Sequence, residues 1–467
     1  MSNAKVFNVL EESGLLRNKY LCAFLARDNT SVALLLLLVA AFSFVLRPSI
    51  RGHDGVLNYA YLRSVLIDRD LDFTNDYHYY LSRESDWFDN QQLPRDPVTN
   101  RPINLYGVGS SILWSPWVLA AHAYCRLSSS RRDAWQADGF SFPYEAAVGL
   151  GSCFYASVGL LFLHLVLRRR FGRRTAFWTC ISIWLATPLF FYTYLHPSMS
   201  HANSFFLAAL LLWLYTNGDG IGRWISMGAA AGLLSATRFQ DAALLAGIAA
   251  GEGWRILHAR IDGDFIRSRA IRYILATAAA LIMFSPQFVA WHYLQGSALS
   301  GPRAYLMQGS VRLWAPVHAV EVMFSPRHGV FYWHPMLLLG LLGLFVGRRL
   351  PRLRLICLVM FTAELWVVSC WSLWWAGASF GHRLFISALP ALALGIASFI
   401  PRWRVTRSLT PAVVIILVVW NFGYVVQYGS GMISRQAAVG IRELAYNNVI
   451  RVPKLLLGIN LNADGKK

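Results

Sequence analysis

Long apolar runs separated by short polar segments make up most of this chain. Several runs reach the length of about 17 to 25 residues that a helix needs to cross a hydrocarbon layer of about 30 Å. The pattern predicts about eleven spanning helices, and the two between residues 224 and 254 are short enough to be a broken pair. The expected spans are 31–47, 143–167, 175–195, 199–216, 224–237, 241–254, 273–295, 331–347, 355–375, 383–400 and 410–428.

The polar segment 48–142 holds eleven of the chain's 24 acidic residues and two further helical patterns. From Val56 to Ile67, apolar residues recur at near-helical spacing, which predicts an amphipathic helix in the membrane interface. Residues 105–125 are apolar enough to span the membrane. We instead expect a surface or re-entrant helix there, because a span would put the basic cluster 168–174 on the exterior side.

Composition indicates the class of protein. The chain is 56% hydrophobic and 14% charged, whereas soluble domains have roughly 25% charged residues. We therefore predict an all-α polytopic membrane protein. The net charge of +19 comes mostly from short basic clusters between apolar runs, which are typical of cytoplasmic anchors and argue against a nucleic-acid partner. The six cysteines show no CxxC spacing, so we expect buried thiols. The first apolar run has no small-residue cleavage site after it, which favours a membrane helix over a signal peptide.

Basic residues also predict the orientation. With an inside N-terminus, the inside segments carry 22 Lys and Arg in 76 residues, against 18 in 169 for the outside segments. Basic residues concentrate on the cytoplasmic side of membrane proteins. The predicted organisation is a cytoplasmic segment 1–30, a transmembrane domain 31–428 with exterior loops 48–142 and 296–330, and an exterior tail 429–467.

Asp54 is the first candidate for chemistry. It lies in Arg51-Gly52-His53-Asp54-Gly55, just beyond the first apolar run, where a charge is costly unless it serves a function. The alternative is an ordinary solvated loop acid. The acids that follow in DRDLDFTND (68–76) have the spacing of residues that cap helices and face water, and they do not form an acidic twelve-residue calcium loop.

Two arginines stand close to apolar segments on the predicted exterior side. Arg238 lies in SATRFQD between two short runs, where it either pairs with Asp241 or contacts an anionic ligand. Arg383 follows a Gly/Ser-rich turn, beside His382, and begins a helix, a setting that favours phosphate oxygens. The alternative for Arg383 is an anchor at the membrane interface.

Several polar residues fall on the same predicted side. No histidine pair there has HxH or HxxxH spacing with a nearby carboxylate, so we expect no metal site. Hydrogen bonding or phosphate contact is the expected use of the histidines. The candidate substrate contacts are His53, His196, His201, Gln240, Arg327 and His328.

Three motifs resemble the GT-C superfamily of polyprenyl-phosphate-sugar-dependent glycosyltransferases. The segment HDGVLNYAYLRSVLIDRDLDFTNDY (53–77) is similar to the first exterior loop of bacterial members. NLYGVGSSILWSP (104–116) is similar to their YPxG helix, and GASFGHR (377–383) to a late turn. The chain departs from better-known branches: Asp54 lacks a neighbouring acid, HPSMSH (196–201) replaces an Asp-rich turn, and Ala376 follows the Trp pair. Those departures argue against protein acceptors and an obligatory divalent metal.

The resemblance implies an inverting glycosyltransferase in the bacterial inner membrane, with its active site facing the periplasm. The donor would be a polyprenyl-phosphate-linked sugar, and the acceptor a glycan or glycolipid of the cell envelope. Asp54 would act as the base, and Arg238, Arg383 and His382 would bind the donor phosphate without a cofactor. The alternatives are a transporter or flippase of a lipid-linked intermediate, and an envelope glycan polymerase or ligase. Against transport, the polar residues crowd one side and no inverted repeat is visible.

Overall fold

The computed structural model describes residues 29–81, 95–128, 135–302, 315–347, 350–400 and 404–459. Within these ranges the protein is helical, and an isolated bridge between Arg95 and Pro102 is the one β-type pairing. The predicted cytoplasmic segment 1–30 lies outside the described residues except for its last two positions. The prediction of an all-α fold is confirmed.

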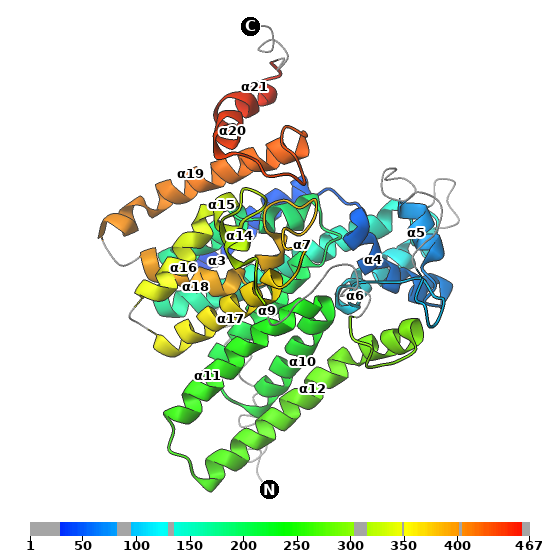
Figure 1. The fold of residues 1–467 in the computed structure, drawn as a ribbon, viewed down its shortest axis with the longest axis horizontal. Coiled ribbons are helices and arrows are strands. Elements are labelled where there is room, and N and C mark those ends of the chain that lie inside the picture. The colour runs from blue at the N-terminus through cyan, green and yellow to red at the C-terminus, as the bar shows by residue number, and fades with distance from the viewer. Residues whose placement is uncertain are drawn as a thin grey trace.

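The helices form one packed body, from which α10, α11 and α12 extend toward the lower left of Figure 1. In chain order the structure contains α3 (Asn29–Phe42), η2 (Ser43–Val45), α4 (Gly52–Arg63), η3 (Ser64–Asp68), α5 (Thr74–Leu81), α6 (Gly109–Ser128), α7 (Phe142–Phe171), α8 (Arg173–Leu185), η4 (Phe191–Leu195), α9 (His201–Thr216), α10 (Ile221–Thr237), η5 (Phe239–Leu244), α11 (Leu245–Leu257), α12 (Gly263–Gln295), α14 (Ala319–Phe324), α15 (Val330–Trp333), α16 (Pro335–Val346), α17 (Pro351–Ser369), η6 (Arg383–Ile386), α18 (Leu389–Phe399), α19 (Arg404–Gly429), α20 (Ile441–Tyr446), η8 (Asn447–Arg451) and α21 (Val452–Leu456).

Among the described residues, three helices are long and apolar enough to cross a membrane: α7, α12 and the part of α19 from Ser408 to Gly429. Shorter apolar helices accompany them. On α12, Ile274, Ile282 and Val289 are 66%, 68% and 65% exposed, and an apolar surface of this kind needs lipid around it. The chain is a polytopic membrane protein, as its composition predicts.

Several predicted spans are interrupted in the structure. The span 175–195 divides into α8 and η4, and Pro188 stands between them. Proline lacks the amide hydrogen that a continuous helix needs and clashes with the preceding turn. The predicted broken pair at 224–254 is confirmed, because η5 separates α10 from α11. Arg238 lies at the junction of α10 and η5.

Small residues allow the closest helix contacts. A side chain added at Gly343 of α16 would collide with the backbone of Gly395 in α18, and one at Gly395 would collide with Gly340. Close backbone approach through small residues is typical of helix packing in membranes. This contact fixes α18, whose preceding turn carries Arg383.

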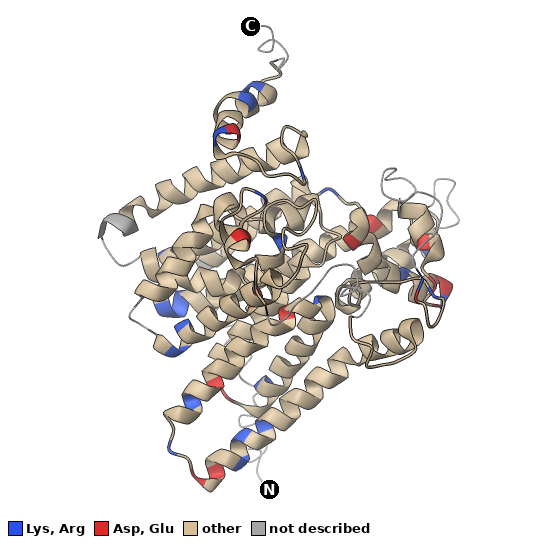
Figure 2. Cartoon of the chain, in the orientation of Figure 1, with Lys and Arg blue, Asp and Glu red and all other residues tan. Residues whose placement is uncertain are grey.

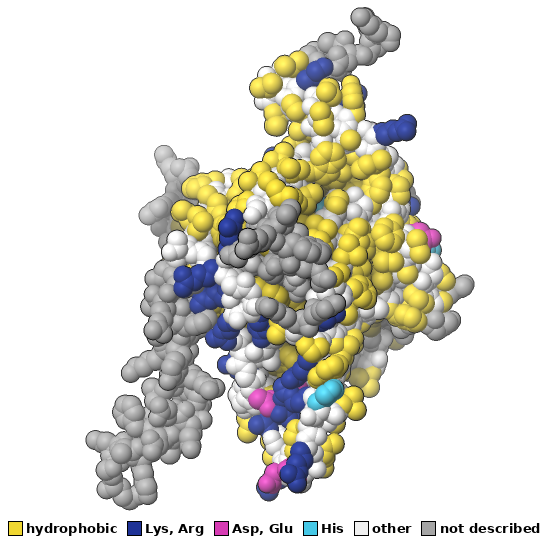
Figure 3. Space-filling model, turned by 90° about the vertical axis from the view of Figure 1, so that its left-hand side faces the viewer, with side chains coloured by type: hydrophobic (Ala, Val, Ile, Leu, Met, Phe, Trp, Pro, Cys, Tyr) yellow, Lys and Arg dark blue, Asp and Glu magenta, His cyan; other side chains and the backbone are white. Residues whose placement is uncertain are grey.

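Charged residues gather at the ends of the helices and leave the middle of the body largely uncharged (Figure 2). On the face seen from the left of Figure 1, hydrophobic side chains cover much of the upper half, and basic side chains are more numerous over the lower half, with a few at the top (Figure 3). This separation is typical of a protein whose apolar band lies in lipid.

The first polar segment contains α4, η3, α5 and α6. The predicted helix after Asp54 is confirmed as α4, but its expected amphipathic character is wrong, because Gly55 to Tyr61 are all buried. The helices α5 and α6 pack on α4, and its polar groups are bonded inside: Asn58 donates to the Asp54 carbonyl at 2.6 Å and Tyr59 to the Gly139 carbonyl at 2.8 Å.

The acids of 68–76 follow their predicted role only in part. Asp72 accepts hydrogen bonds from the Thr74 amide and hydroxyl, at 3.0 and 2.5 Å, at the start of α5. Asp76 departs from the prediction. It is completely buried and forms an ion pair with Arg63 at 3.4 Å. Asp68 pairs with the same guanidinium at 2.6 Å. Arg63 and Asp76 lie 13 residues apart in the sequence, and nothing in the pattern of the segment predicted this inward pair.

Candidate active site

The start of α4 places Asp54 against the turn 196–200. Gly52 adopts φ +69°, a left-handed conformation that favours glycine, and lies close to the His196 ring. A side chain at Gly55 would collide with Ser198. Asp54 therefore stands in the first turn of α4, where the helix dipole favours a negative charge.

The Asp54 carboxylate is held by two side chains from distant parts of the chain. Arg383 Nη1 lies 2.9 Å from Asp54 Oδ2, and the Tyr106 hydroxyl donates to Oδ1 at 2.6 Å. The side chains of Asp54 and Arg383 are 17% and 12% exposed, so the pair lies at an accessible edge of the body. The structure thus brings together the candidate base and one of the candidate phosphate ligands.

This environment keeps Asp54 ionised. Burial pushes the pKa of Asp54 upward, but the charge of Arg383, the Tyr106 hydroxyl and the neighbouring His53 outweigh it, and the pKa lies below its ordinary value. Burial also lowers the pKa of His53, against the pull of Asp54. The site therefore presents a carboxylate beside a neutral imidazole at pH 7.

Tyr106 reaches Asp54 through the NLYG segment. The Asn104 side chain donates to the Leu57 carbonyl of α4 at 2.8 Å and accepts the Tyr106 amide at 3.1 Å. One asparagine thereby ties the segment before α6 to the helix that carries Asp54. The sequence pointed to this segment as a helix entry, but a lone tyrosine gave no signal of its contact with Asp54.

Arg383 is set by the turn 376–382. Gly381 adopts φ +58°, and a side chain there would collide with His334. The Phe380 amide donates to the Tyr192 hydroxyl at 2.9 Å, and His328 Nδ1 lies 2.8 Å from the Trp375 carbonyl oxygen. His328 is fully buried, so the structure places it behind the turn as a support.

His196 lies where several charges converge. Burial, together with the charges of Arg51, Arg383 and Arg435, lowers its pKa to about 3, and Asp54 acts the opposite way. Arg51 donates to the Leu195 carbonyl at 2.7 Å. Neither Arg51 nor Arg435 stood out in the sequence, because arginine in a polar loop is common.

Arg238 lies in a second, deeper group. It is 8% exposed, and its Nη1 is 3.0 Å from His201 Nδ1 and 4.0 Å from Asp241 Oδ1. Asp241 also accepts hydrogen bonds from Ser204 and, at 3.0 Å, from Ser387. The ion pair considered from the sequence is therefore present at the limit of contact, and the His201 bond is an additional one.

His382 lies between the two arginines. Burial lowers its pKa to about 3, with smaller effects from the charges of His328, Arg238 and Arg383. Gln240 points elsewhere, since its amide donates to Glu364 at 2.8 Å on α17. Glu364 is completely buried, and the sequence gave no signal of this contact.

Arg327 contacts the C-terminal tail. Its Nε donates to the Gln436 carbonyl at 2.5 Å, and its guanidinium lies 3.7 Å from the centre of the Trp375 ring. The structure does not bring it to Asp54. The described part of the chain has no group of three or more His, Cys, Asp or Glu side chains placed to hold a metal ion.

The arrangement of the helices defines the class of fold: the chain has a GT-C fold. It is similar to the structure of ArnT from Cupriavidus metallidurans bound to undecaprenyl phosphate, with a TM-score of 0.50, 13% identity, and coverage of 91% of this chain and 77% of that one. Apo ArnT from the same organism has a TM-score of 0.47 at 14% identity, with 91% and 76% coverage. The apo oligosaccharyltransferase of Archaeoglobus fulgidus has 0.43 at 12%, with 90% and 54% coverage. No protein-family model and no curated sequence matches the chain.

Proposed function

We propose that the protein is an inverting membrane glycosyltransferase that uses a polyprenyl-phosphate-linked sugar. The observation that carries the proposal is the Asp54–Arg383 pair at an accessible edge of a GT-C fold. A carboxylate accepts the proton of an attacking hydroxyl, and a guanidinium stabilises a leaving phosphate. ArnT, which shares the fold, was solved with undecaprenyl phosphate bound, in keeping with a donor of this kind.

In the proposed reaction the acceptor hydroxyl gives its proton to Asp54 while its oxygen attacks the anomeric carbon. The bond from that carbon to the phosphate oxygen breaks, and polyprenyl phosphate leaves with the electron pair. Attack from the side opposite the leaving group inverts the anomeric centre. Arginines supply the positive charge, so the proposal needs no metal ion.

The ion pair also gives the reaction an order. A carboxylate whose pKa is held low is a weak base. When the donor phosphate approaches Arg383, it competes with Asp54 for the guanidinium. The carboxylate then loses its strongest counter-charge and becomes a better base as the donor arrives.

The acceptor in this proposal is a lipid-linked or cell-envelope glycan, and the site faces the exterior side of a bacterial inner membrane. The orientation rests on the distribution of basic residues between the predicted inside and outside segments, and the acceptor rests on the resemblance of the three motifs to bacterial GT-C members. A cysteine-accessibility scan tests the orientation: labelling of residue 170 from the exterior would overturn it.

The activity is tested with purified protein and a panel of polyprenyl-phosphate sugars, measuring sugar release and transfer. We expect Asp54→Asn to lower the rate by about 10²- to 10⁴-fold, the usual contribution of a general base. Asp70→Asn, an exposed acid of the same segment, serves as the control. Normal transfer by Asp54→Asn would remove Asp54 from the mechanism, and no turnover of any donor by the wild type would favour a transporter.

A further inference from the structure

One side of α19 changes its surroundings along the length of the helix. Positions 409, 413, 416, 420, 423 and 427 follow one another at intervals of three or four residues, so they lie in one stripe. In the first half of the stripe, Leu409, Val413 and Ile416 are 52%, 40% and 64% exposed. The part of α19 from Ser408 to Gly429 is long and apolar enough to cross a membrane, and these exposed apolar side chains therefore face lipid.

The second half of the stripe is covered by α20 and η8. The Asn448 side-chain amide donates to the Trp420 carbonyl at 3.0 Å, and a side chain added at Gly423 would collide with Asn448. The Gln427 side-chain amide donates to the Leu444 carbonyl at 3.1 Å and to Asn448 Oδ1 at 2.5 Å. The chain after α19 therefore turns back and occupies the place that lipid takes on the first half.

This contact lies at membrane depth. Trp420 precedes the last residue of α19, Gly429, by nine positions, which corresponds to about 13 Å along a helix that rises about 1.5 Å per residue. The same end of α19 is tied to the candidate active site, because the Tyr428 hydroxyl donates to the Ala378 carbonyl at 3.0 Å in the turn that leads to Arg383. The segment 441–459 thus lies beside the half of the span that ends at the site.

The exposed side chains of the segment 441–459 are mostly apolar. Val449, Leu456 and Leu457 are 63%, 71% and 76% exposed, and α20 and α21 project from α19 away from the rest of the body (Figure 1). A helical segment that lies next to a lipid-facing helix and exposes apolar side chains has the character of an interfacial element, whose apolar surface is covered by acyl chains.

The charges of this part of the chain are almost all positive. Between residues 430 and 459 the sequence has one acid, Glu443, and four basic residues, Arg435, Arg442, Arg451 and Lys454. Arg442 and Arg451 are exposed. Long basic side chains reach from an apolar surface to the headgroup layer, and anionic headgroups attract them.

We infer that the segment 441–459 is an interfacial anchor, which lies in the leaflet on the side of the Asp54–Arg383 pair and binds the anionic headgroups of phospholipids through Arg442 and Arg451. Leu456 and its apolar neighbours lie among the acyl chains. The tail that the sequence predicts outside the membrane is then held in the membrane surface as far as residue 459. The inference goes beyond the proposed function, because it rests on α19 and the surface beside it and not on the chemistry of the site.

Photo-cross-linking of the full-length protein in lipid nanodiscs tests what covers the segment. Benzoylphenylalanine replaces Leu456, the nanodiscs contain equal parts of phosphatidylglycerol and phosphatidylcholine, and mass spectrometry identifies the adducts after illumination. We expect lipid adducts at residue 456 and far fewer with the same replacement at Ser434, an exposed position of the loop 430–440. Equal yields of lipid adduct at the two positions, a cross-linked protein dimer, or no adduct at residue 456 would overturn the inference.

The headgroups of the adducts at residue 456 test the two arginines. We expect phosphatidylglycerol to be enriched over phosphatidylcholine, and Arg451→Gln to lower that enrichment about fivefold, the effect of one basic residue near an anionic membrane surface. Arg260→Gln, at an exposed position between α11 and α12, is the control and should leave the enrichment unchanged. An Arg442→Gln, Arg451→Gln double variant that keeps the wild-type enrichment would overturn the headgroup site.

Discussion

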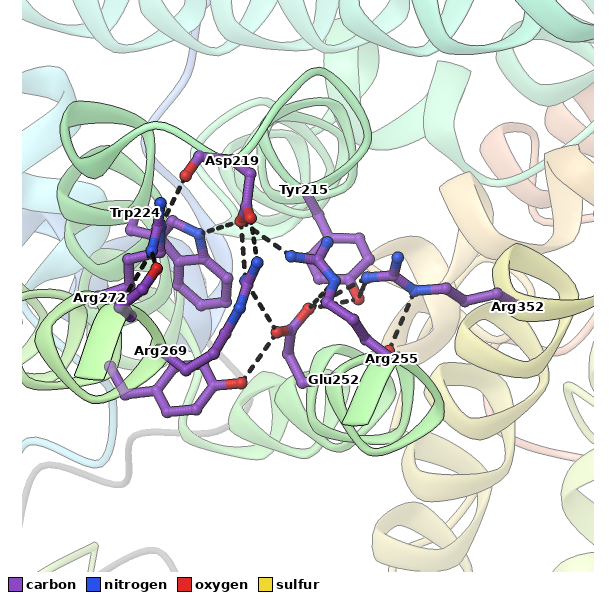
Figure 4. A network of polar contacts seen from close by, with 11 residues as sticks. Tyr215, Asp219, Trp224, Glu252, Arg255, Arg269, Arg272 and Arg352 are labelled. Atoms are coloured by element: carbon purple, nitrogen blue, oxygen red, sulfur yellow. Dashed lines mark hydrogen bonds and ion pairs between the residues drawn. The ribbon is translucent and has the colours of Figure 1, made fainter. Parts of the chain in front are cut away.

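The two ends of α9 use the same residue types in opposite ways. Near His201, at its start, the Asp54 carboxylate pairs with Arg383 at 2.9 Å and accepts the Tyr106 hydroxyl, and both members of the ion pair are partly exposed. The other end of α9 lies about 24 Å away, because the helix has 16 residues that each rise about 1.5 Å. There, near Tyr215, arginines, tyrosines and a tryptophan surround Asp219 and Glu252 (Figure 4).

The carboxylates of this second network are saturated. Glu252 accepts bonds from Tyr215 at 2.8 Å, Tyr273 at 2.9 Å and Arg352 at 3.1 Å. Asp219 forms ion pairs with Arg255 and Arg269. These partners come from α9, α11, α12 and α17, so the network ties four helix ends together. The comparison teaches that a carboxylate with a full set of buried partners acts as a structural clamp, whereas the partly exposed Asp54–Arg383 pair is the one that we propose to meet a ligand.

Breaking the clamp should produce the largest effect on stability. Glu252 is 6% exposed, and replacing it with Gln removes the carboxylate that pairs with Arg352 and leaves Arg269 with Asp219 alone. Loss of one partner of a buried ion pair costs about 3 to 5 kcal/mol, and the lower end applies here because the Arg352 side chain is 31% exposed. Denaturant titration in detergent should therefore show an unfolding free energy lower by about 3 kcal/mol, with transfer by the folded fraction unchanged.

The control is Asp264→Asn, an exposed acid at the start of α12, which should leave the unfolding free energy within about 0.5 kcal/mol of the wild type. Normal stability of Glu252→Gln together with lost transfer would move this network from structure to function, and the contrast between the two ends of α9 would fail.

A variant of Asp76 tests whether the burial of an acid in segment 48–142, rather than its position in that segment, determines its effect on stability. Burial raises its pKa to about 7, against the pull of Arg63. The folded-state pKa lies above the unfolded value of 3.8, so the stability that the group contributes is present at low pH and is lost as pH rises through about 7. Melting curves should show a loss of about 2 kcal/mol between about pH 5.5 and 8.5.

Asp76→Asn should remove most of that pH dependence, while Asp70→Asn, at an exposed position, should keep it. If the Asp76 variant retains the wild-type dependence, another group titrates in this range, and Asp76 resembles the accessible acid Asp54 more closely than its burial suggests.

Hydropathy located the helices well because an apolar run is a local property. The predicted span 143–167 lies within α7, but the helix at 273–295 begins ten residues earlier, at Gly263, where Asp262 caps it by accepting the Phe265 amide at 2.8 Å. A polar helical extension of this kind has no hydropathy signal. The breaks at Pro188 and Arg238 likewise come from backbone geometry.

The sequence predicted a site residue only where a charged residue lies next to an apolar run. Asp54 and Arg383 satisfied that condition, and they pair. Tyr106, Arg51 and Arg435 did not, because the groups that they act on lie between about 50 and 240 residues away in the sequence and only the packed chain brings them together. The catalytic and binding roles of Asp54 and Arg383 stay predictions for the experiments proposed above.

Tyr106→Phe sharpens the account of the Asp54 end with a smaller change. The variant removes the hydroxyl that donates to Asp54 at 2.6 Å and helps to lower its pKa. The pKa of Asp54 should rise, and the acid limb of the pH–rate profile should move to higher pH, because the base must be deprotonated. We expect the rate at low pH to fall about tenfold, the scale of one hydrogen bond to a charge.

Tyr332→Phe is the matched control, since its hydroxyl bonds the tail at Val439 and not Asp54. It should leave the acid limb in place. A limb that does not move in Tyr106→Phe, or moves to lower pH, would mean that Asp54 is not the base whose ionisation the profile reports.

The smallest expected difference comes from two glycines, one at each end of α9. Gly52 adopts φ +69° with the His196 ring 3.2 Å from the position of an added Cβ, whereas Gly220 has φ −67° and open space around it. Gly52→Ala forces an L residue into the left-handed region, which costs about 1 kcal/mol, and it presses on the turn that faces Asp54. Gly220→Ala meets neither obstacle and should be neutral. The melting temperature and the rate of sugar transfer should both fall in Gly52→Ala and stay unchanged in Gly220→Ala. Equal behaviour of the two variants would show that the Asp54 end does not depend on the backbone conformation that precedes α4, and that the carboxylate is placed by Arg383 and Tyr106 instead.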